Sequence, residues 1–268
     1  MSVADGAARQ EYGTIVVVGG GCYGGYYVRQ LHRAVQANAI AAREVVVVDR
    51  DAECQVAREL ASNAAAAVPT RVVVAEWRDY FTDYLGAAAS APESYSSDAV
   101  VPSPLMPHLM GEWLVGRAQA RWPSREMATQ PFDRAPAVPW ERAGADGTHY
   151  VSFATWMCPI NCVEPRTCPH TRDVRSWSMP ERLAEHSRAE AEAETGRPIV
   201  VATLFCRHRA YGVGMFGTGE VLAADDRIRT AGEAGSAEVI IGTVSHCHGA
   251  LTRLVIGAPA ALADSHVG

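Results

Sequence analysis

Short apolar runs alternate with helical segments through the first third of the chain. Two β-rich apolar runs, at residues 14–18 and 44–48, flank residues 26–42, whose composition is helical. Apolar runs bounded by turn-forming residues are typical of buried parallel strands. The order strand, helix, strand therefore predicts the opening unit of an α/β domain.

The same alternation continues to residue 120. It predicts a helix at 52–66, a strand at 71–75, a strand at 99–101 and a helix at 109–120. Prolines then interrupt the pattern repeatedly between Trp122 and Pro139, and no helix runs through such a stretch. We interpret residues 1–121 as a first domain and residues 122–147 as a proline-rich connection.

Residues 148–268 form the remaining part of the chain. They predict a strand at 149–154, a helix at 180–195 and late strands at 199–204 and 238–244. The late strands are apolar, so this part is expected either as a separate α/β part or as a continuation of the first sheet. The fold expected is α/β, with a Rossmann-like, doubly wound, mostly parallel sheet and a cysteine-rich, metal-binding C-terminal part.

A glycine loop follows the first predicted strand. Gly19, Gly21 and Gly24 have the G-x-G-x-x-G spacing, and Cys22 and Tyr23 complete the segment. In such a loop Gly19 makes the tight turn, Gly21 lets the backbone approach a pyrophosphate, and Gly24 lets the helix pack closely on its strand. The amide groups at the start of the helix then hold the phosphates.

An acidic residue closes the second predicted strand. Asp49 is placed to accept hydrogen bonds from the ribose hydroxyls of NAD, although the neighbouring Arg50 leaves NADP open. S-adenosylmethionine and FAD also bind to glycine loops with a ribose-binding acid, so these ligands stay alternatives.

The stretch IVVVGGGCYGGYYVRQL, followed by REVVVVDRD, resembles the TrkA-N or RCK-type NAD-binding Rossmann domains. The resemblance is confined to the N-terminal quarter of the chain. It implies dinucleotide binding at Gly19, Gly21, Gly24 and Asp49, and it implies nothing about the remaining residues.

Three cysteines, Cys158, Cys162 and Cys168, lie close to His170 in a loop that prolines keep extended. The spacing between the first two suits zinc, and the Cys-Pro pairs are similar to those of iron–sulfur loops. We favour a [4Fe-4S] cluster, because a redox centre beside a nicotinamide has an obvious use. Zinc is the alternative, and buried thiols without metal are a third reading.

A fourth ligand has to come from elsewhere in the chain. Cys247 is the first choice and Cys206 the second, because each follows a late apolar strand. If those strands join the parallel sheet, their carboxyl ends meet at the ligand-binding edge. His248 and Gly249 after Cys247 resemble a strand-to-helix turn.

Three residues are candidates for catalysis. Ser103 and His108 follow the fourth predicted strand, where a nicotinamide ring would lie, and His248 follows a late strand. A histidine can donate or accept a proton near neutral pH, and a serine hydroxyl can orient a carbonyl.

Charge and composition narrow the partners. The chain has 24 basic and 30 acidic residues, for a net charge of −6, and no basic stripe, so nucleic acid is not expected as a partner. All 24 basic residues are arginine. Schiff-base enzymes and Walker A nucleotide-binding loops need a lysine, so both classes are excluded.

The location of the protein is predicted from its apolar runs and cysteines. No run approaches the roughly 18 apolar residues of a membrane span, and residues 1–11 lack the apolar core of a secretory signal. A cytoplasmic protein with no membrane partner is expected. Its seven cysteines then serve as thiols or metal ligands and not as disulfides.

These observations predict an NAD(H)-dependent oxidoreductase that carries an iron–sulfur cluster and acts on a small molecule. A redox partner protein and a homo-oligomer are further expectations. Two alternatives stay open: a non-catalytic, NAD-sensing regulatory protein with a structural zinc site, and an S-adenosylmethionine-dependent methyltransferase.

Overall fold

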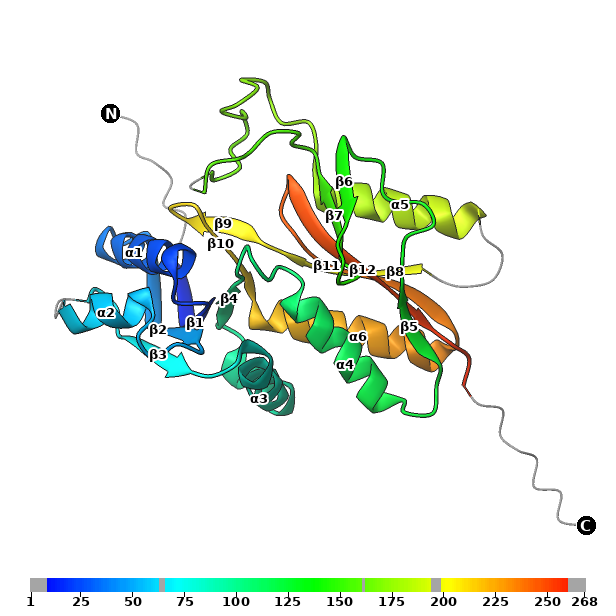
Figure 1. Cartoon of the computed structure of the whole chain (residues 1–268), viewed down its shortest axis with the longest axis horizontal. Helices are drawn as coiled ribbons and strands as arrows, with labels where there is room; N and C mark the ends of the chain where they lie inside the picture. Colours follow the sequence, from blue (N-terminus) through cyan, green and yellow to red (C-terminus); the bar gives the residue numbers. More distant parts are fainter. Residues whose placement is uncertain (1–8, 63–65, 161, 194–198, 260–268) are drawn as a thin grey trace, which may run out of the picture. The chain divides into compact units, whose positions relative to one another are not determined.

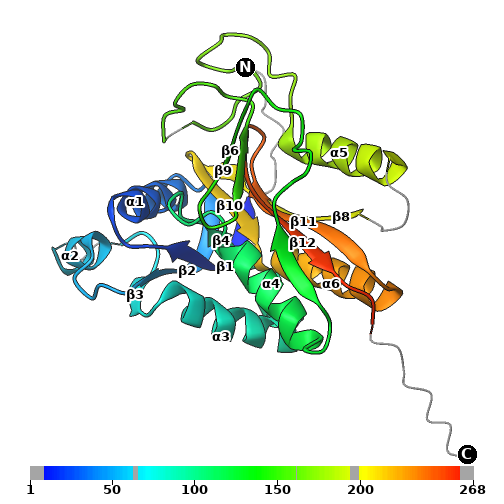
Figure 2. The same ribbon diagram turned by 45° about the vertical axis from the view of Figure 1, so that its right-hand side comes forward.

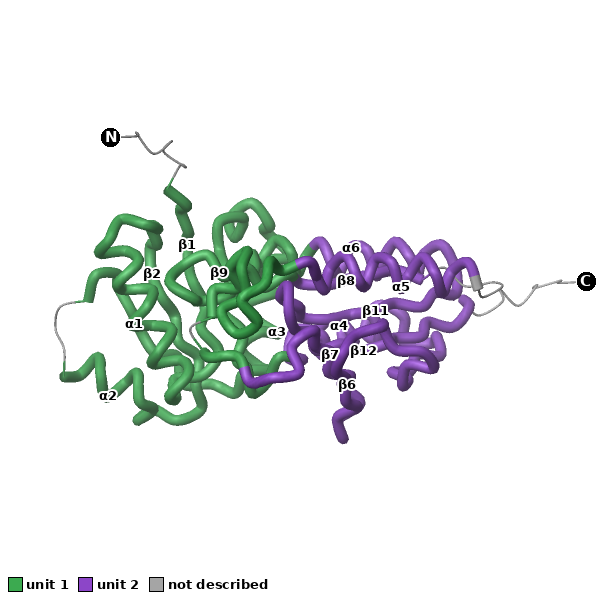
Figure 3. The backbone as a smooth tube through the Cα atoms, turned by 90° about the horizontal axis from the view of Figure 1, so that it is seen from above, with its two compact units in different colours: residues 1–107, 158–175, 205–222 green, residues 108–157, 176–204, 223–268 purple. Residues whose placement is uncertain are grey.

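The structure is a computed structural model that describes residues 9–62, 66–160, 162–193 and 199–259. The chain forms two compact units, each assembled from three separate stretches (Figure 3). The first unit comprises residues 1–107, 158–175 and 205–222, and the second comprises residues 108–157, 176–204 and 223–268. The units are therefore interleaved along the chain, unlike the three consecutive segments 1–121, 122–147 and 148–268 expected from the sequence.

The first unit is built on a six-stranded sheet with the order β3-β2-β1-β4-β10-β9 (Figure 1). Its elements are β1 (Gln10–Val18), α1 (Cys22–Gln36), β2 (Ile40–Asp49), α2 (Gln55–Ser62), β3 (Thr70–Val74), α3 (Trp77–Ser90), the 3-10 helix η1 (Pro92–Tyr95), β4 (Ala99–Val101), β9 (Arg207–Ala210) and β10 (Val213–Gly217). Strands β3, β2, β1 and β4 are parallel, whereas β10 and β9 add antiparallel pairs at one edge. The parallel order 3-2-1-4 is found in doubly wound nucleotide-binding sheets.

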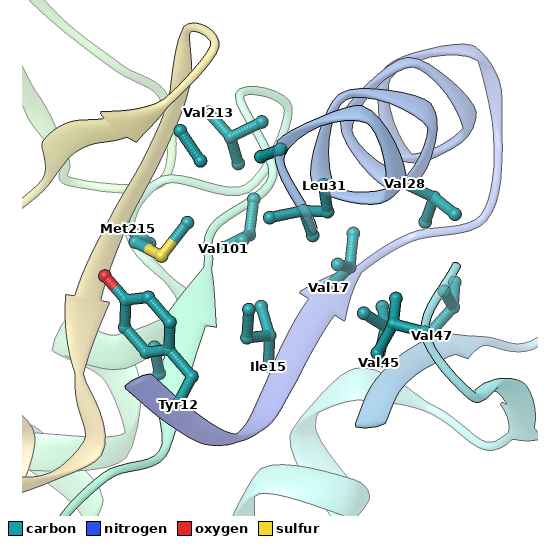
Figure 4. Close-up of a cluster of buried hydrophobic side chains, with 14 of the residues drawn as sticks. Tyr12, Ile15, Val17, Val28, Leu31, Val45, Val47, Val101, Val213 and Met215 are labelled. Atoms are coloured by element: carbon teal, nitrogen blue, oxygen red, sulfur yellow. The ribbon is translucent and has the colours of Figure 1, made fainter. Parts of the chain in front are cut away.

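Apolar side chains cover both faces of this sheet. Ile15 and Val17 of β1 and Val45 of β2 are buried in a cluster that includes Val28 and Leu31 of α1 (Figure 4). The residues that alternate with them along β1 and β2 are buried as well. Strands buried on both faces read as continuous apolar runs, which explains why the sequence predicted them.

The register of β1 explains where a ligand site can form in this unit. Val17 pairs with Val47 on one side and with Val101 of β4 on the other. The carboxyl ends of β1 and β4 are therefore neighbours, although one strand continues into α1 and the other into a proline-rich loop. The chain runs outward from β1 through β2 to β3 and then returns to the other side of β1 as β4, so the strand order reverses between β1 and β4. Open α/β sheets usually bind ligands at the carboxyl ends of two such strands.

The second unit is built on a separate sheet, with the order β6-β7-β12-β11-β8 and β5 also paired to β12 (Figure 2). Its elements are α4 (Leu109–Arg121), β5 (Met127–Gln130), β6 (Trp140–Ala143), β7 (His149–Ser152), α5 (Met179–Ala193), β8 (Ile199–Phe205), α6 (Thr218–Ala234), which begins in the first unit, β11 (Ala237–Val244) and β12 (His248–Ile256). The pairs β6–β7, β7–β12, β5–β12 and β11–β12 are antiparallel.

The idea that the late strands continue the parallel sheet is wrong. Both β8 and β11 lie in the second sheet. Strand β11 is followed directly by β12, and a short turn joins the two in an antiparallel hairpin. Parallel neighbours would need a long crossover, for which the chain leaves no room there.

Helices α4 and α5 cover opposite faces of the second sheet. Ile241 lies beside α4, where a Cβ on Gly111 would be 3.5 Å from its Cγ2 atom. Ile240, the preceding residue, lines a cavity together with His186 of α5. Because successive strand residues point to opposite faces, the two helices must lie on different sides. The α/β class is thus confirmed. Among the described residues, no helix is both long and apolar enough to span a bilayer.

Candidate functional site

The glycine loop begins with a tight turn at Gly19. This residue has φ +88°, in the left-handed region that glycine adopts without strain. Its amide donates a 2.9 Å hydrogen bond to the carbonyl oxygen of Val48, and the indole nitrogen of Trp77 donates to the same oxygen at 2.9 Å. The end of β2 and the start of α3 therefore fix the turn.

The start of α1 is open and positively polarised. A Cβ on Gly21 would meet no described atom within 4 Å, whereas a Cβ on Gly24 would lie 1.8 Å from the carbonyl oxygen of Gly19. Gly21 is the N-cap of α1 and provides no side-chain acceptor, and the first turn, which includes Cys22 and Tyr23, contains no acidic residue. The first amides of the helix thus face a space that an anionic group can occupy.

Asp49 holds the loop from the end of β2. Its Oδ2 atom accepts a 2.6 Å hydrogen bond from the amide of Gly20, and Oδ1 accepts one of 2.9 Å from the amide of Asp51. A carboxylate oxygen accepts more than one hydrogen bond, so Asp49 retains capacity for hydroxyl donors. The neighbouring Arg50 is exposed.

Sequence reasoning missed part of this loop. A Cβ on Gly20 would lie 2.3 Å from the Sγ atom of Cys54, which is buried. The amide of Val56 also donates to the carbonyl oxygen of Gly20 at 3.0 Å. The available signal was Gly20 itself, the middle one of three consecutive glycines, which the G-x-G-x-x-G pattern does not require.

Ser103 lies in the loop that follows β4, beside the end of β1. It is buried, and its Oγ atom accepts a 3.2 Å hydrogen bond from the amide of Leu105. Its carbonyl oxygen accepts another, of 3.1 Å, from the amide of Met106. Ser103 therefore shapes the turn, and its hydroxyl is buried close to the carboxyl end of β4.

His108 is the first residue of the second unit and the N-cap of α4. Its Nε2 atom lies 3.5 Å from Glu112 Oε1, and its Nδ1 atom lies 3.5 Å from Asp146 Oδ2. Partial burial opposes ionisation of Asp146, but hydrogen bonds from Thr148 and the charge of His108 outweigh it and lower the pKa of this carboxyl. His108 is thus held between two carboxylates.

His248 also lies in the second unit, at the start of β12. Its Nδ1 atom is 3.0 Å from Ser152 Oγ, and that hydroxyl donates its proton to the carbonyl oxygen of Ala154 at 2.7 Å. With the serine proton engaged, His248 must donate from Nδ1, which fixes one tautomer of the neutral ring. Ser152 therefore orients the ring of His248, a contact that the sequence did not reveal.

The expected metal ligands are divided between the two units. Cys158, Cys162, Cys168 and the second-choice Cys206 belong to the first unit, and Cys247 belongs to the second. Within the described parts of the chain, no three Cys, His, Asp or Glu side chains come together as metal ligands. The described residues therefore show no [4Fe-4S] cluster site or four-ligand zinc site, and both stay predictions.

The turn that carries Cys247 differs from the expected strand-to-helix turn. It joins β11 to β12, and the hydroxyl oxygen of Ser245 accepts hydrogen bonds of 3.2 Å from the amides of Cys247 and His248. The indole nitrogen of Trp177 donates to the Sγ atom of Cys247 at 3.3 Å. The prediction of a strand-to-helix turn is wrong, because the residues after Val244 fold back as a hairpin.

Two thiols of the first unit have pKa values shifted in opposite directions. Amide donation from Thr171 lowers the pKa of Cys168, whose amide and carbonyl oxygen bond to the small hairpin around it. Burial raises the pKa of Cys206 to about 12. Cys168 therefore has the greater thiolate character, whereas Cys206, between β8 and β9, is held as a thiol.

These units define a mixed α/β protein with an open glycine loop at the edge of a parallel sheet. Residues 110–257 match the family model AF_1314_C, described as an uncharacterized protein, C-terminal domain. The match covers more than half of the chain, and the protein belongs to this family. No curated protein and no solved structure matches the chain. The matched region includes β9 and β10, so it contributes to both units.

Proposed function

We propose that the first unit binds NAD(H) at the glycine loop. One arrangement carries the proposal: the turn at Gly19, the close approach of Gly24 to it, and the carboxylate of Asp49 bonded to the amide of Gly20. The loop leaves the start of α1 open for a pyrophosphate, and Asp49 is placed for the ribose hydroxyls. Together these features support the Rossmann-like character expected from the sequence.

The charges around the ribose position favour NAD over NADP. Asp49 is the last residue of β2, and Asp51 and Glu53 follow it; the amide of Glu53 donates a 2.9 Å hydrogen bond to Asp51 Oδ1. A 2′-phosphate placed there would be repelled by these carboxylates. Arg50 is the opposing cation, and it is exposed.

We further propose that the protein is an oxidoreductase acting on a small molecule. Bound NAD would supply a hydride acceptor or, once reduced, a hydride donor. The support is the position of Ser103, which is buried at the edge where β1 and β4 end side by side. Its hydroxyl would orient a polar group of the substrate there.

Calorimetric titration of the full chain with NADH, NADPH and S-adenosylmethionine tests the proposal. We expect NADH to bind with a Kd at least about tenfold lower than that of NADPH, a difference of roughly 1.4 kcal/mol. S-adenosylmethionine should not bind measurably. Tight binding of S-adenosylmethionine without NADH binding would overturn the proposal in favour of a methyltransferase.

The iron–sulfur cluster and its zinc alternative remain predictions, and the described positions of the cysteines give them no support. Anaerobic purification followed by iron, sulfide and zinc analysis decides between them. Matching iron and sulfide in a brown preparation would restore the cluster. One zinc per chain, with NADH binding but no oxidation of it, would favour the regulatory alternative.

A further inference from the structure

A cavity of about 260 Å³ lies in the second unit, between α5 and one face of the second sheet. His186 and Glu190 line it from the helix, and Glu238, Ile240 and Arg253 line it from the sheet. The segment at 132–134 and Ile199 complete the wall. Pockets for drug-sized ligands are larger, at roughly 300–1,000 Å³, so a ligand here has to be small.

The guanidinium of Arg253 is already paired with two carboxylates. Its guanidinium pairs with both carboxylate oxygens of Glu238, and its Nη1 atom lies 2.8 Å from Asp133 Oδ2 and 2.9 Å from the carbonyl oxygen of Pro131. The side chains of Arg253 and Glu238 are both buried. These contacts use four of the five N–H donors of Arg253, so the guanidinium is fixed in place and its charge is paired with the two carboxylates.

One carboxylate oxygen of Glu190, in contrast, lacks a hydrogen-bond donor among the described residues. Its Oε1 atom is buried and lies 3.1 Å from Arg134 Nη1, yet it accepts a hydrogen bond from none of the described residues. Arg134 is 69% exposed, so its guanidinium is held weakly. A buried carboxylate oxygen without a hydrogen bond favours any donor that can reach it.

The lining carries one more negative than positive group. Asp133, Glu190 and Glu238 supply three carboxylates, against the guanidinium groups of Arg134 and Arg253. His186 adds no charge at neutral pH, because burial lowers its pKa. The cavity as a whole is therefore complementary to a single positive charge.

Aromatic and aliphatic side chains complete the recognition surface. Phe132 packs against His186, with ring centroids 6.4 Å apart, and both rings line the cavity with Ile199 and Ile240. An aromatic face attracts an organic cation and also buries its carbon skeleton. A bare metal ion would not use this surface, and no described trio of acidic, Cys or His side chains is grouped to hold one.

We propose that this cavity binds a small organic cation, such as a primary ammonium on a compact apolar body. The ammonium pairs with Glu190 in place of Arg134, and the apolar body lies against Phe132 and the two isoleucines. This site goes beyond the proposed NAD(H) function and does not depend on it, because every lining residue belongs to the second unit.

The experiment uses three probes of one shape on the full chain: benzylammonium, neutral benzyl alcohol and benzoate. Binding is measured by saturation-transfer NMR and by calorimetry at pH 7.5. We expect benzylammonium to bind about tenfold or more tightly than benzyl alcohol, and benzoate not to bind, since one charge pair of this kind is worth about a factor of ten. Equal affinities for all three probes would overturn the proposal.

A pair of variants on α5 tests the role of Glu190. Glu190→Gln should weaken benzylammonium binding about tenfold, whereas Glu192→Gln, an exposed acid on the same helix, should leave it unchanged. If Glu190→Gln fails to fold, Phe132→Leu replaces it and should weaken binding several-fold. Unchanged binding in the folded variant contradicts the assignment. NADH affinity, measured in parallel, should be the same in all variants, so the two proposals fail separately.

Discussion

A Cβ atom on Gly24 would lie 1.8 Å from the carbonyl oxygen of Gly19. No side chain fits in that gap, because even the methyl group of alanine needs more than 3 Å from a backbone oxygen. The first turn of α1 therefore lies directly against the turn at Gly19, with no room for a side chain between them. This separation sets the shape of the loop and of the open space in front of α1.

The close contact makes Gly24 the most sensitive position of the loop. Gly24→Ala should destabilise the protein by about 2–3 kcal/mol, because the start of α1 must move away from the turn. NADH binding should be lost together with the loop shape. Urea denaturation measures the first effect and calorimetric titration the second.

Gly86→Ala is the matched control for this variant. Gly86 lies in α3, and a Cβ there would meet no described atom within 4 Å. Alanine should be neutral or stabilise the helix by up to about 1 kcal/mol. A Gly24→Ala variant as stable as the Gly86→Ala protein would show that the loop does not require the contact.

Gly21 allows ligand binding to be tested without loss of the fold. It is the N-cap of α1 and has open space around it, so Gly21→Asp should preserve or slightly raise stability. The new carboxylate should repel a pyrophosphate and weaken NADH binding by at least about a hundredfold, or roughly 2.7 kcal/mol. Gly21→Asn has the same shape without the charge, and it should bind NADH more tightly than the aspartate variant.

The two cysteines with opposite pKa changes should differ in reactivity. Because the pKa of Cys168 is lowered and that of Cys206 is raised to about 12, iodoacetamide at pH 7.5 should label Cys168 first. Labelling of Cys168 should speed up with pH and level off below the ordinary thiol pKa. Peptide mass spectrometry after timed quenching gives both rates, and equal rates at the two positions would refute the assignment.

A buried acid stabilises the second unit. Asp225 accepts hydrogen bonds of 3.0 and 2.8 Å from Arg121, and Arg117 lies 3.5 Å away. Asp225→Ala leaves these arginines without their acid and should cost about 3 kcal/mol in urea denaturation. The adjacent Asp226 is 62% exposed, so Asp226→Ala should cost less than about 0.5 kcal/mol. Similar losses of stability in both variants would show that the buried ion pair of Asp225 with Arg121 contributes no more than the exposed Asp226 does.

The first unit was largely predictable because its signals are local. The apolar runs of β1 and β2 and the glycines between them lie within 40 residues of sequence, and each strand is buried on both faces. Helix α4 and strand β4 were confirmed at almost the expected positions. Helix α3 was missed, since its alanines and aromatic residues show only a weak amphipathic pattern.

Strands β9 and β10 were missed for a different reason. Their glycines are typical of a loop, yet Gly214 lies within β10. A Cβ there would be 2.7 Å from Cys206 Sγ and 2.8 Å from His208 Cδ2, which explains why this strand position is a glycine. A glycine that makes room for neighbouring side chains cannot be distinguished by composition from one that makes a turn. Composition alone therefore does not indicate the two strands that the sheet has here.

The residues of the candidate site also differ in how well the sequence predicts their positions. The loop at Gly19, Gly21 and Gly24 with Asp49 is specified by spacing, so its geometry was accessible from the residues alone. The positions of Cys158 and Cys247 depend on how the chain is divided between two units, which spacing does not encode. The cavity beside Glu190 was also inaccessible, since it joins residues 132–134 with residues of α5, β8, β11 and β12.

The alternation of the chain between the units has a consequence for synthesis on the ribosome. When residue 107 emerges, β4 has no partner on its outer side, because β10 is more than 100 residues away in the sequence. An unpaired strand of this kind is prone to pair with other chains. The nascent N-terminal part should therefore need protection by a chaperone until residue 217 is made, and a messenger truncated before that point should yield insoluble protein.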